Sequence, residues 1–406
     1  MPVPVSLDDP PGRRLTGTGF TGTGPTGASV NTRDPIGAAE PSPADGLLTC
    51  ADLLACPECA RPLTPEARTL RCPAGHTFDL AKQGYVSLLT GAATKMTGDT
   101  PAMLDARAAF QSAGHFAPLA EAITRTLTTA LAAGRIDPAA EPRAHRPLPG
   151  RAESDSATRK SIAAGPADRA SAMRATGIAR PGGAVVATSA ARLATALLAA
   201  QRSDDGASTS GAGHSGGTAV LEIGAGTGYY LAAVLDSLPR ARGIALDVSK
   251  AAARRAARAH TRAGAVLADA WRGLPVRDGV MDAVVCVFAP RNAEEVARVL
   301  GRGGVFVVVT PTPRHLGEIV GPLGMVSVDA AKQDRLAESL GAWFEAVEQV
   351  AVEYSMSLTH ADIANVAGMG PSAHHAARDR ADRIAALPDL MPVTASVTVA
   401  VYRPRA

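Results

Sequence analysis

Four side chains of the types that bind zinc lie close together near the N-terminus. Cys56 and Cys59 form a C-x2-C pair, and Cys72 and His76 form a C-x3-H pair after twelve intervening residues. Zinc in structural sites takes four thiolate or imidazole ligands, and two short turns of this kind supply them. The spacing therefore predicts a zinc site made of these four residues, with a loop of free cysteines as the alternative.

The remaining cysteines fit other roles. The chain has five cysteines in total. Cys50 precedes the first pair and is a weaker candidate ligand, whereas Cys286 lies inside an apolar run and is predicted to pack in the core. Clustered cysteines without a secretory signal favour metal binding over disulfides. The most apolar window of the chain, 183–200, contains Arg192 and is therefore too polar to span a membrane. We therefore expect a soluble, cytoplasmic protein without a membrane segment.

A second group of candidate residues follows an apolar run that reads as a strand. The run ends in Leu221-Glu222-Ile223-Gly224-Ala225-Gly226-Thr227-Gly228. Glycines at a strand-to-helix turn let the backbone bend and approach a ligand closely. The dinucleotide fingerprint needs its third glycine at position 229, where Tyr229 stands, so the G-x-G-x-G spacing argues against a pyrophosphate. Glu222, just before the turn, suits an amino group.

Two more carboxylates follow the next two apolar runs. Asp247 ends one and is predicted to accept hydrogen bonds from ribose hydroxyls, while Asp269-Ala270 ends the next and is predicted to meet an adenine amino group. Amine, ribose and adenine contacts together predict S-adenosylmethionine, with three unrelated surface acids as the alternative. The predicted cofactor residues from this pattern are Glu222, Gly224, Gly226, Thr227, Gly228, Asp247, Asp269 and Ala270.

The elements that position these residues alternate between short apolar strands and helices. Short, wholly apolar strands separated by helices indicate a parallel sheet covered on both faces. The fold class is therefore α/β, a Rossmann-like, doubly wound sheet, whose last strand is expected to be antiparallel. Predicted strands are 219–223, 243–246, 265–267, 283–288, 305–309, 350–354 and 395–402, and predicted helices among them are 229–238, 249–260 and 292–300.

Composition shifts divide the chain into five parts. Residues 1–46 are rich in Gly, Thr and Pro and are expected to form a disordered tail, and 47–95 form the zinc-binding module. Residues 96–135 form a helical connector, with Thr100 capping a first helix and a second at 118–133. Residues 136–217 form a low-complexity insertion with a short helix near 188–202, and 218–406 form the methyltransferase domain.

Several blocks of residues, in order, resemble the RlmA-type 23S rRNA (guanine-N1)-methyltransferases, nearest the Gram-positive macrolide-resistance branch. The zinc pattern runs into Gly84-Tyr85-Val86, and this block is highly specific. The resemblance covers about residues 50–120 and 218–375. The chain departs from the family pattern in its tail, in its insertion and at Phe116, where members carry tyrosine. Further blocks are Gly98-Asp99, Ala106-Arg107, Gly114-His115-Phe116, Leu246-Asp247-Val248-Ser249, Phe288-Ala289-Pro290, Pro313-Arg314-His315 and Gly368-Met369-Gly370-Pro371-Ser372.

The resemblance implies a zinc ion held by Cys56, Cys59, Cys72 and His76. It implies a cofactor bound near Phe116, Gly226, Thr227, Asp247 and His315. It also implies a homodimer that grips a hairpin of 23S rRNA, methylates N1 of a guanine in its loop, and has a link to antibiotic resistance.

Residues on the substrate side are less well defined by the sequence. Pro290 and Arg291 follow the fourth strand, where the methyl group should lie, with a simple strand end as the alternative for Pro290. For His315 the alternative to a cofactor contact is a solvent-facing loop. His374 and His375 have no third ligand nearby, which favours a surface position or an RNA contact.

Two basic groups are candidates for RNA contacts. Arg254, Arg255, Arg258 and Arg262 form a stripe on one predicted helix, with an ordinary solvated face as the alternative. In the zinc module, the predicted groove consists of Arg61, Arg68, Arg71, Lys82 and, as a stacking ring, Tyr85.

Two other functions are compatible with these motifs. One is a methyltransferase of small molecules, because the fold does not determine the substrate; the separate zinc module argues against it. The other is a non-catalytic RNA-binding protein that retains the fold, against which the intact acidic strand ends argue.

Overall fold

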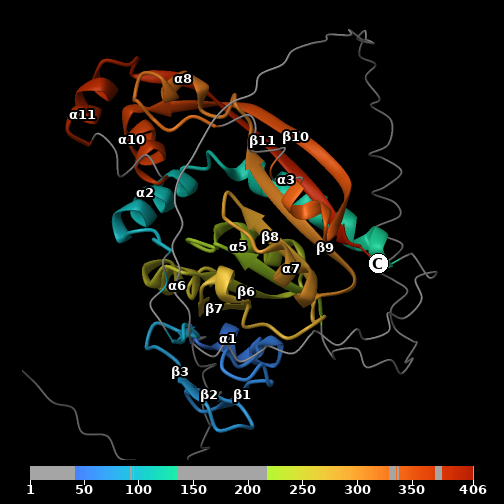
Figure 1. Cartoon of the computed structure of the whole chain (residues 1–406). Helices are drawn as coiled ribbons and strands as arrows, with labels where there is room; N and C mark the ends of the chain where they lie inside the picture. Colours follow the sequence, from blue (N-terminus) through green and yellow to red (C-terminus); the bar gives the residue numbers. More distant parts are fainter. Residues whose placement is uncertain are drawn as a thin grey trace, which may run out of the picture. The chain divides into compact units, whose positions relative to one another are not determined.

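The computed structural model describes residues 42–91, 94, 96–135, 217–328, 335, 338–370 and 377–405 (Figure 1). The predicted tail up to residue 41, nearly all of the predicted insertion with its helix at 188–202, and Pro371, Ser372, His374 and His375 lie outside these residues. Within the described part of the chain, no helix is long and apolar enough to cross a membrane.

An eight-stranded mixed sheet forms the centre of the described structure. Its order is β10-β11-β9-β8-β5-β6-β7-β4. β11 runs antiparallel to both of its neighbours, β10 and β9, and all other neighbouring strands are parallel. All seven predicted strands are present, and the antiparallel last strand is confirmed. The bounds are β4 (Tyr85–Ser87), β5 (Ala219–Ile223), β6 (Arg242–Asp247), β7 (Ala263–Leu267), β8 (Met281–Val287), β9 (Leu300–Pro311), β10 (Phe344–Thr359) and β11 (Leu390–Pro404).

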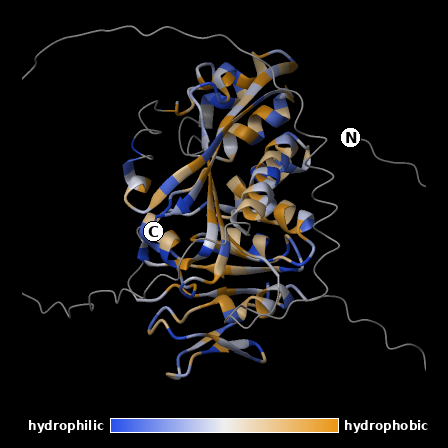
Figure 2. Ribbon diagram, turned by 90° about the vertical axis from the view of Figure 1, so that its right-hand side faces the viewer, coloured by the Kyte–Doolittle hydropathy of each residue, from blue (hydrophilic) through white to orange (hydrophobic). Residues whose placement is uncertain are grey.

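Both faces of this sheet are buried, which explains why its central strands are mostly apolar. Successive side chains of a strand point to opposite faces, so Val220 belongs to one hydrophobic cluster and Leu221 to the other. Figure 2 shows hydrophobic residues concentrated on the central strands. The doubly wound α/β fold is thus confirmed.

Helices cover the two faces. One cluster contains residues of α3 (Ala117–Arg135), α5 (Tyr229–Ser237), α6 (Lys250–Ala256) and α10 (His360–Gly368), and the other contains residues of α1 (Asp45–Thr49) and α7 (Ala293–Val299). The predicted helix after Thr100 is α2 (Pro101–Ser112), where the Thr100 hydroxyl accepts a hydrogen bond from Met103 N at 3.3 Å. The remaining helices are α8 (Gly317–Val320) and α11 (Ala377–Ala385), with 3-10 turns η1 (Ala51–Leu53) and η2 (Ala270–Arg272).

A small antiparallel sheet forms the zinc module. It consists of β1 (Thr64–Glu66), β2 (Thr69–Arg71) and β3 (Thr77–Asp79) in that order. Leu63 and Leu70 are buried, and they belong to the hydrophobic cluster on one face of the large sheet. The module therefore shares its apolar core with the methyltransferase sheet.

The segment 47–95 is less separate than the sequence indicates. Tyr85–Ser87, near the end of the predicted zinc module, forms an edge strand of the large sheet, with Tyr85 opposite Ala265 of β7. At the other end, Gly46 of α1 lies so close to β7 that a Cβ there would be 2.3 Å from the Ala263 carbonyl oxygen. Both ends of the zinc module are thus part of the methyltransferase layers.

Candidate functional site

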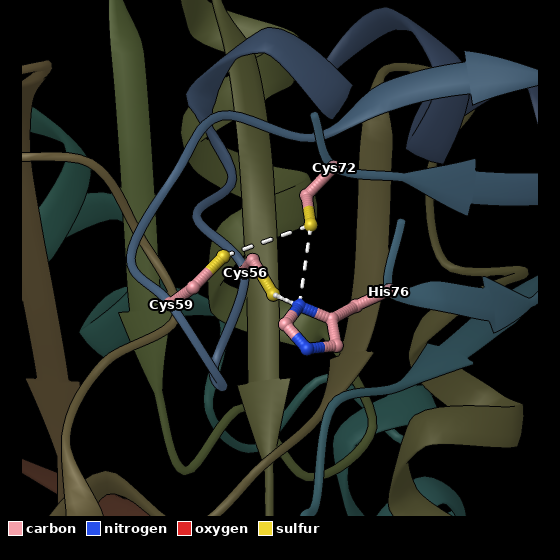
Figure 3. Close-up of side chains that lie close together, drawn as sticks. All are labelled: Cys56, Cys59, Cys72 and His76. Atoms are coloured by element: carbon pink, nitrogen blue, oxygen red, sulfur yellow. Dashed lines mark hydrogen bonds between the residues drawn. The ribbon is translucent and has the colours of Figure 1, made fainter. Parts of the chain in front are cut away.

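The four predicted zinc ligands converge on one point (Figure 3). The Cys56 and Cys72 sulfurs lie 3.5 and 3.3 Å from His76 Nδ1, and the Cys59 and Cys72 sulfurs are 3.6 Å apart. In a tetrahedral site with ordinary zinc bond lengths, S···S distances are about 3.8 Å and S···N distances about 3.6 Å. The donor set and its spacing therefore fit zinc.

The local backbone explains how two short turns present these ligands. Ala60 N donates to the Cys56 carbonyl at 2.7 Å, and Gly75 N donates to the Cys72 carbonyl at 2.9 Å, which closes one turn around each pair. Burial opposes ionisation of the Cys72 thiol, but backbone N–H groups of His76 and Ala74 lower its pKa to about 6. Stabilising the thiolate in this way favours the form that binds metal.

The glycine-rich turn lies between β5 and α5, at the carboxyl edge of the sheet. Gly224 has φ of +71°, and a Cβ there would be 2.4 Å from Ala289 Cβ. Gly226 has φ of +55°, and a Cβ there would be 2.6 Å from a guanidinium nitrogen of Arg107. A larger residue at Gly224 would be strained and would clash with Ala289, whereas one at Gly226 would be strained and would displace the Arg107 guanidinium.

Asp247 closes this turn from the end of β6. Its carboxylate accepts hydrogen bonds from Gly226 N and Ser249 N, both at 2.8 Å. The side chain is buried, and burial raises its pKa. Each carboxylate oxygen retains a lone pair, so this position can still accept hydroxyl hydrogen bonds from a ribose.

Glu222 has a different environment from the one that the sequence suggests. Its carboxylate is buried beneath the turn and accepts a hydrogen bond from Leu231 N at 3.0 Å, in the first turn of α5. Burial raises its pKa to about 8. The described partner of Glu222 is therefore a helix N–H group, and its contact with an amino group stays a prediction.

Asp269 is buried at the end of β7. It accepts hydrogen bonds from Trp271 N at 3.0 Å and from the Thr94 hydroxyl at 2.6 Å. The last residues of the predicted zinc module therefore reach this strand end. Ala270 follows it and is half-buried, in the position that the sequence assigns to adenine.

Two polar side chains of α2 lie beside the glycine-rich turn, and the sequence analysis named only Arg107, without assigning it a role. Arg107 forms an ion pair with Asp99 at 2.6 Å and donates to the Met369 carbonyl at 2.8 Å, at the end of α10. Gln111 is buried and accepts a hydrogen bond from the Thr227 hydroxyl at 2.7 Å. The signal for Arg107 was its place in the Ala106-Arg107 block.

Phe116 is buried next to this region. Its ring packs edge-on against Phe110, with centroids 4.9 Å apart, and it belongs to the core cluster that also contains Tyr230. The neighbouring His115 pairs with Asp362 at 3.2 Å. The predicted cofactor contact of Phe116 stays a prediction, since the described contacts of the ring are with core residues.

The substrate side of the site lies at the ends of β8 and β9. Pro290 is exposed. Arg291 is half-buried and interacts with the buried thiol of Cys286, so its side chain is less available to contact a base or a phosphate than the sequence predicts. His315 follows β9, and its Nδ1 accepts a hydrogen bond from Ser396 N at 3.2 Å. Its ring lies 5.7 Å from the ring of Phe288, which is exposed at the end of β8.

The predicted basic stripe is partly correct. Arg254, Arg255 and Arg258 line an open groove between α2 and α6 that reaches Thr227. Arg255 pairs with Asp105 there. Arg262 is not part of the groove, because its guanidinium donates to the Leu238 carbonyl at 2.7 Å and to other carbonyls at the end of α5.

The prediction of a basic groove with one stacking ring in the zinc module is wrong for the ring. Tyr85 is buried in β4 and cannot stack on a base. Arg68 donates to the Leu80 and Ala81 carbonyls, and Arg71 pairs with Glu66 at 3.0 Å. Arg68 and Arg71 thus have structural partners within the module.

Comparison with known proteins places both modules in one family. The family model described as RlmA, N-terminal, matches residues 54–93, and a methyltransferase domain model matches residues 220–304. A Micromonospora griseorubida protein described as a 23S rRNA (guanine-N1)-methyltransferase is 41% identical over 356 residues, covering 86% of this chain and 97% of that protein. The Streptomyces fradiae 23S rRNA (guanine(748)-N1)-methyltransferase is 38% identical over 352 residues, covering 86% and 96%. The chain belongs to the RlmA-type 23S rRNA (guanine-N1)-methyltransferase family.

The family assignment accounts for the two sites described above. The RlmA zinc-ribbon match spans all four converging ligands as well as β4, and the methyltransferase match spans the glycine-rich turn, Asp247 and Asp269. The cofactors of this RlmA-type enzyme are therefore zinc and S-adenosylmethionine. The donor set fits the metal, and the acids around the turn fit a cofactor that carries a positive charge and a ribose.

Proposed function

We propose that this protein transfers a methyl group from S-adenosylmethionine to N1 of a guanine in a hairpin loop of 23S rRNA. The observation that carries the proposal is the match along 97% and 96% of two rRNA methyltransferases, which includes the zinc module as well as the catalytic sheet. Similarity confined to the sheet would support only methyl transfer.

The described residues support this chemistry mainly by positioning. S-adenosylmethionine, when bound, supplies an electrophilic methyl group for in-line displacement. Gly224 and Gly226 let the backbone approach it, Asp247 is placed for its ribose, and Gln111 of α2 holds the turn through the Thr227 hydroxyl. Holding the two reactants in line accounts for much of the rate in such reactions.

The groove between α2 and α6 is the best supported place for RNA phosphates. It lies beside Thr227, and the exposed Arg254 and Arg258 line it. Arginine contacts to phosphate release counterions, so they give an affinity that falls with salt. We propose that this groove holds backbone of the hairpin while the target base enters the site.

The assembly and location are also proposals. The family resemblance supports a homodimer, which sedimentation of the zinc-loaded protein would test: a single species at twice the chain mass is expected, and a monomer at micromolar concentration would contradict it. An rRNA substrate places the enzyme in the cytoplasm with the ribosomes.

Nucleoside analysis tests the chemistry. 23S rRNA from a strain that lacks this gene would be incubated with the protein and isotope-labelled S-adenosylmethionine, digested, and analysed by mass spectrometry. Label in 1-methylguanosine is expected, and an Asp247→Asn variant serves as the control with impaired cofactor binding. Label in another nucleoside, or in small molecules only, would overturn the proposal.

A further inference from the structure

Phe288 has an unusual backbone conformation for its type. Its φ is +55°, and only four non-glycine residues of the described chain have positive φ. A bulky residue in this left-handed region costs free energy that the surrounding structure has to offset, and such strain collects at functional sites. Phe288 is thus held in an unfavourable conformation at the carboxyl end of β8.

The strained backbone holds an aromatic ring in solvent. The Phe288 residue is 43% exposed, whereas Val287 and Cys286 before it are buried. The exposed part of the phenyl ring gains nothing from the hydrophobic effect. Neither stability nor packing explains why this position combines strain with exposure, which points to a ligand.

The position of the ring is fixed by its neighbours. Phe288 N donates to the Val309 carbonyl at 3.1 Å, and the ring lies against His315 with a tilt of 33°. Burial lowers the pKa of His315 to about 4, so the imidazole is neutral at physiological pH. The pair therefore presents an uncharged aromatic surface.

This surface lies directly beside the cofactor turn. Ala289, the next residue, is so close to Gly224 that a Cβ at Gly224 would be 2.4 Å away. In sheets of this kind, ligands bind at the carboxyl ends of the strands, where β5 and β8 are neighbours. A planar group on the Phe288 ring would thus lie at the same edge of the sheet as the glycine-rich turn.

We propose that Phe288 is the residue on which the target guanine stacks, with His315 supporting the ring from behind. This inference rests on the proposed function, because it assumes a purine substrate. A guanine must leave its helix or loop stack before N1 becomes accessible, and an aromatic side chain replaces the lost stacking. Stacking fixes the plane of the base and leaves its N1 edge free to face the cofactor turn.

The test compares variants at position 288 in the zinc-loaded full chain. Loss of one base-stacking ring should lower kcat/KM for rRNA in Phe288→Ala by about 5- to 150-fold. Phe288→Tyr and Phe288→Trp should stay within about threefold of the wild type, because either ring can stack. Affinity for S-adenosylmethionine, measured by calorimetry, should stay the same in all three.

Two controls separate stacking from folding. Phe288→Gly removes the ring but suits positive φ, so it should melt no lower than Phe288→Ala and lose as much activity. Trp343→Ala removes a ring that is 41% exposed at the amino end of the edge strand β10, away from the carboxyl end of β8, and should keep wild-type kcat/KM.

Three results would overturn the inference: full activity in Phe288→Ala, restored activity in Phe288→Gly, or equal losses in Phe288→Ala and Trp343→Ala. A wild type that binds S-adenosylmethionine but methylates no guanine would instead overturn the proposed function.

Discussion

Leu47 gives a direct test of whether the zinc module and the methyltransferase sheet form one cooperative unit. Its side chain is fully buried between α1 and the large sheet, in the cluster that contains Ile244 and Val266. A Cβ at Gly264 would lie 2.8 Å from the Leu47 Cα, so helix and strand are already in contact. The surrounding residues can therefore move little to fill the cavity that Leu47→Ala would leave.

Truncating a buried leucine to alanine costs about 2–5 kcal/mol, and we expect about 3 kcal/mol here. For a domain of this size, that lowers Tm by roughly 6–12 °C. The chain has two tryptophans, Trp271 and Trp343, and both lie in the methyltransferase part. Tryptophan fluorescence during thermal unfolding thus reports the sheet, although the substitution is in the N-terminal segment.

The neighbouring half-buried Leu48 supplies a matched control, and Leu48→Ala should lower Tm clearly less. Chelation of zinc should shift the same fluorescence transition downward, because the module and the sheet share a core. An unchanged tryptophan transition in Leu47→Ala would refute this account and show that the zinc module unfolds on its own.

Three further predictions concern charge. The pKa of the Glu222 carboxyl is raised from 4.5 to about 8, so the carboxyl binds its proton more tightly in the folded state and destabilises the fold progressively as pH rises from about 4.5 to 8. Glu222→Gln can still accept the hydrogen bond from Leu231 N, and this variant should remove the pH trend. Identical profiles of Tm against pH in the two proteins would contradict this prediction. Asp247→Asn should weaken S-adenosylmethionine binding by about 10- to 150-fold, the value of a charge-assisted hydrogen bond, as measured by calorimetry. Arg254→Ala and Arg258→Ala should each reduce the slope of log affinity for rRNA against log salt by about 0.7–0.9, and unchanged slopes in both would exclude the groove.

Much of the central sheet was predictable because local pattern determines it. A mostly apolar run predicted β5 with its observed bounds, and the acids at the ends of β6 and β7 lie at the predicted sheet edge. The zinc quartet was predictable from spacing alone, since each pair lies within one turn. In both cases, the residues that specify the feature are close together in sequence.

Features that depend on distant contacts were not predictable. β4 has three residues, too few to show a period, and its partner β7 lies about 180 residues later, so Tyr85 looked like a free ring. Arg262 looked like part of a basic stripe, but carbonyls at the end of α5 bind its guanidinium. The strained backbone of Phe288 has no sequence signature, because only the folded sheet imposes it.

Primer extension across 23S rRNA tests the central claim most directly. RNA from a strain that lacks this gene would be incubated with the purified protein, with and without S-adenosylmethionine, because methylation at guanine N1 blocks base pairing and stops reverse transcriptase. The account predicts one new stop at a guanine of a hairpin loop. The absence of any new stop or methyl incorporation, in free RNA and in ribosomal particles alike, would contradict the account.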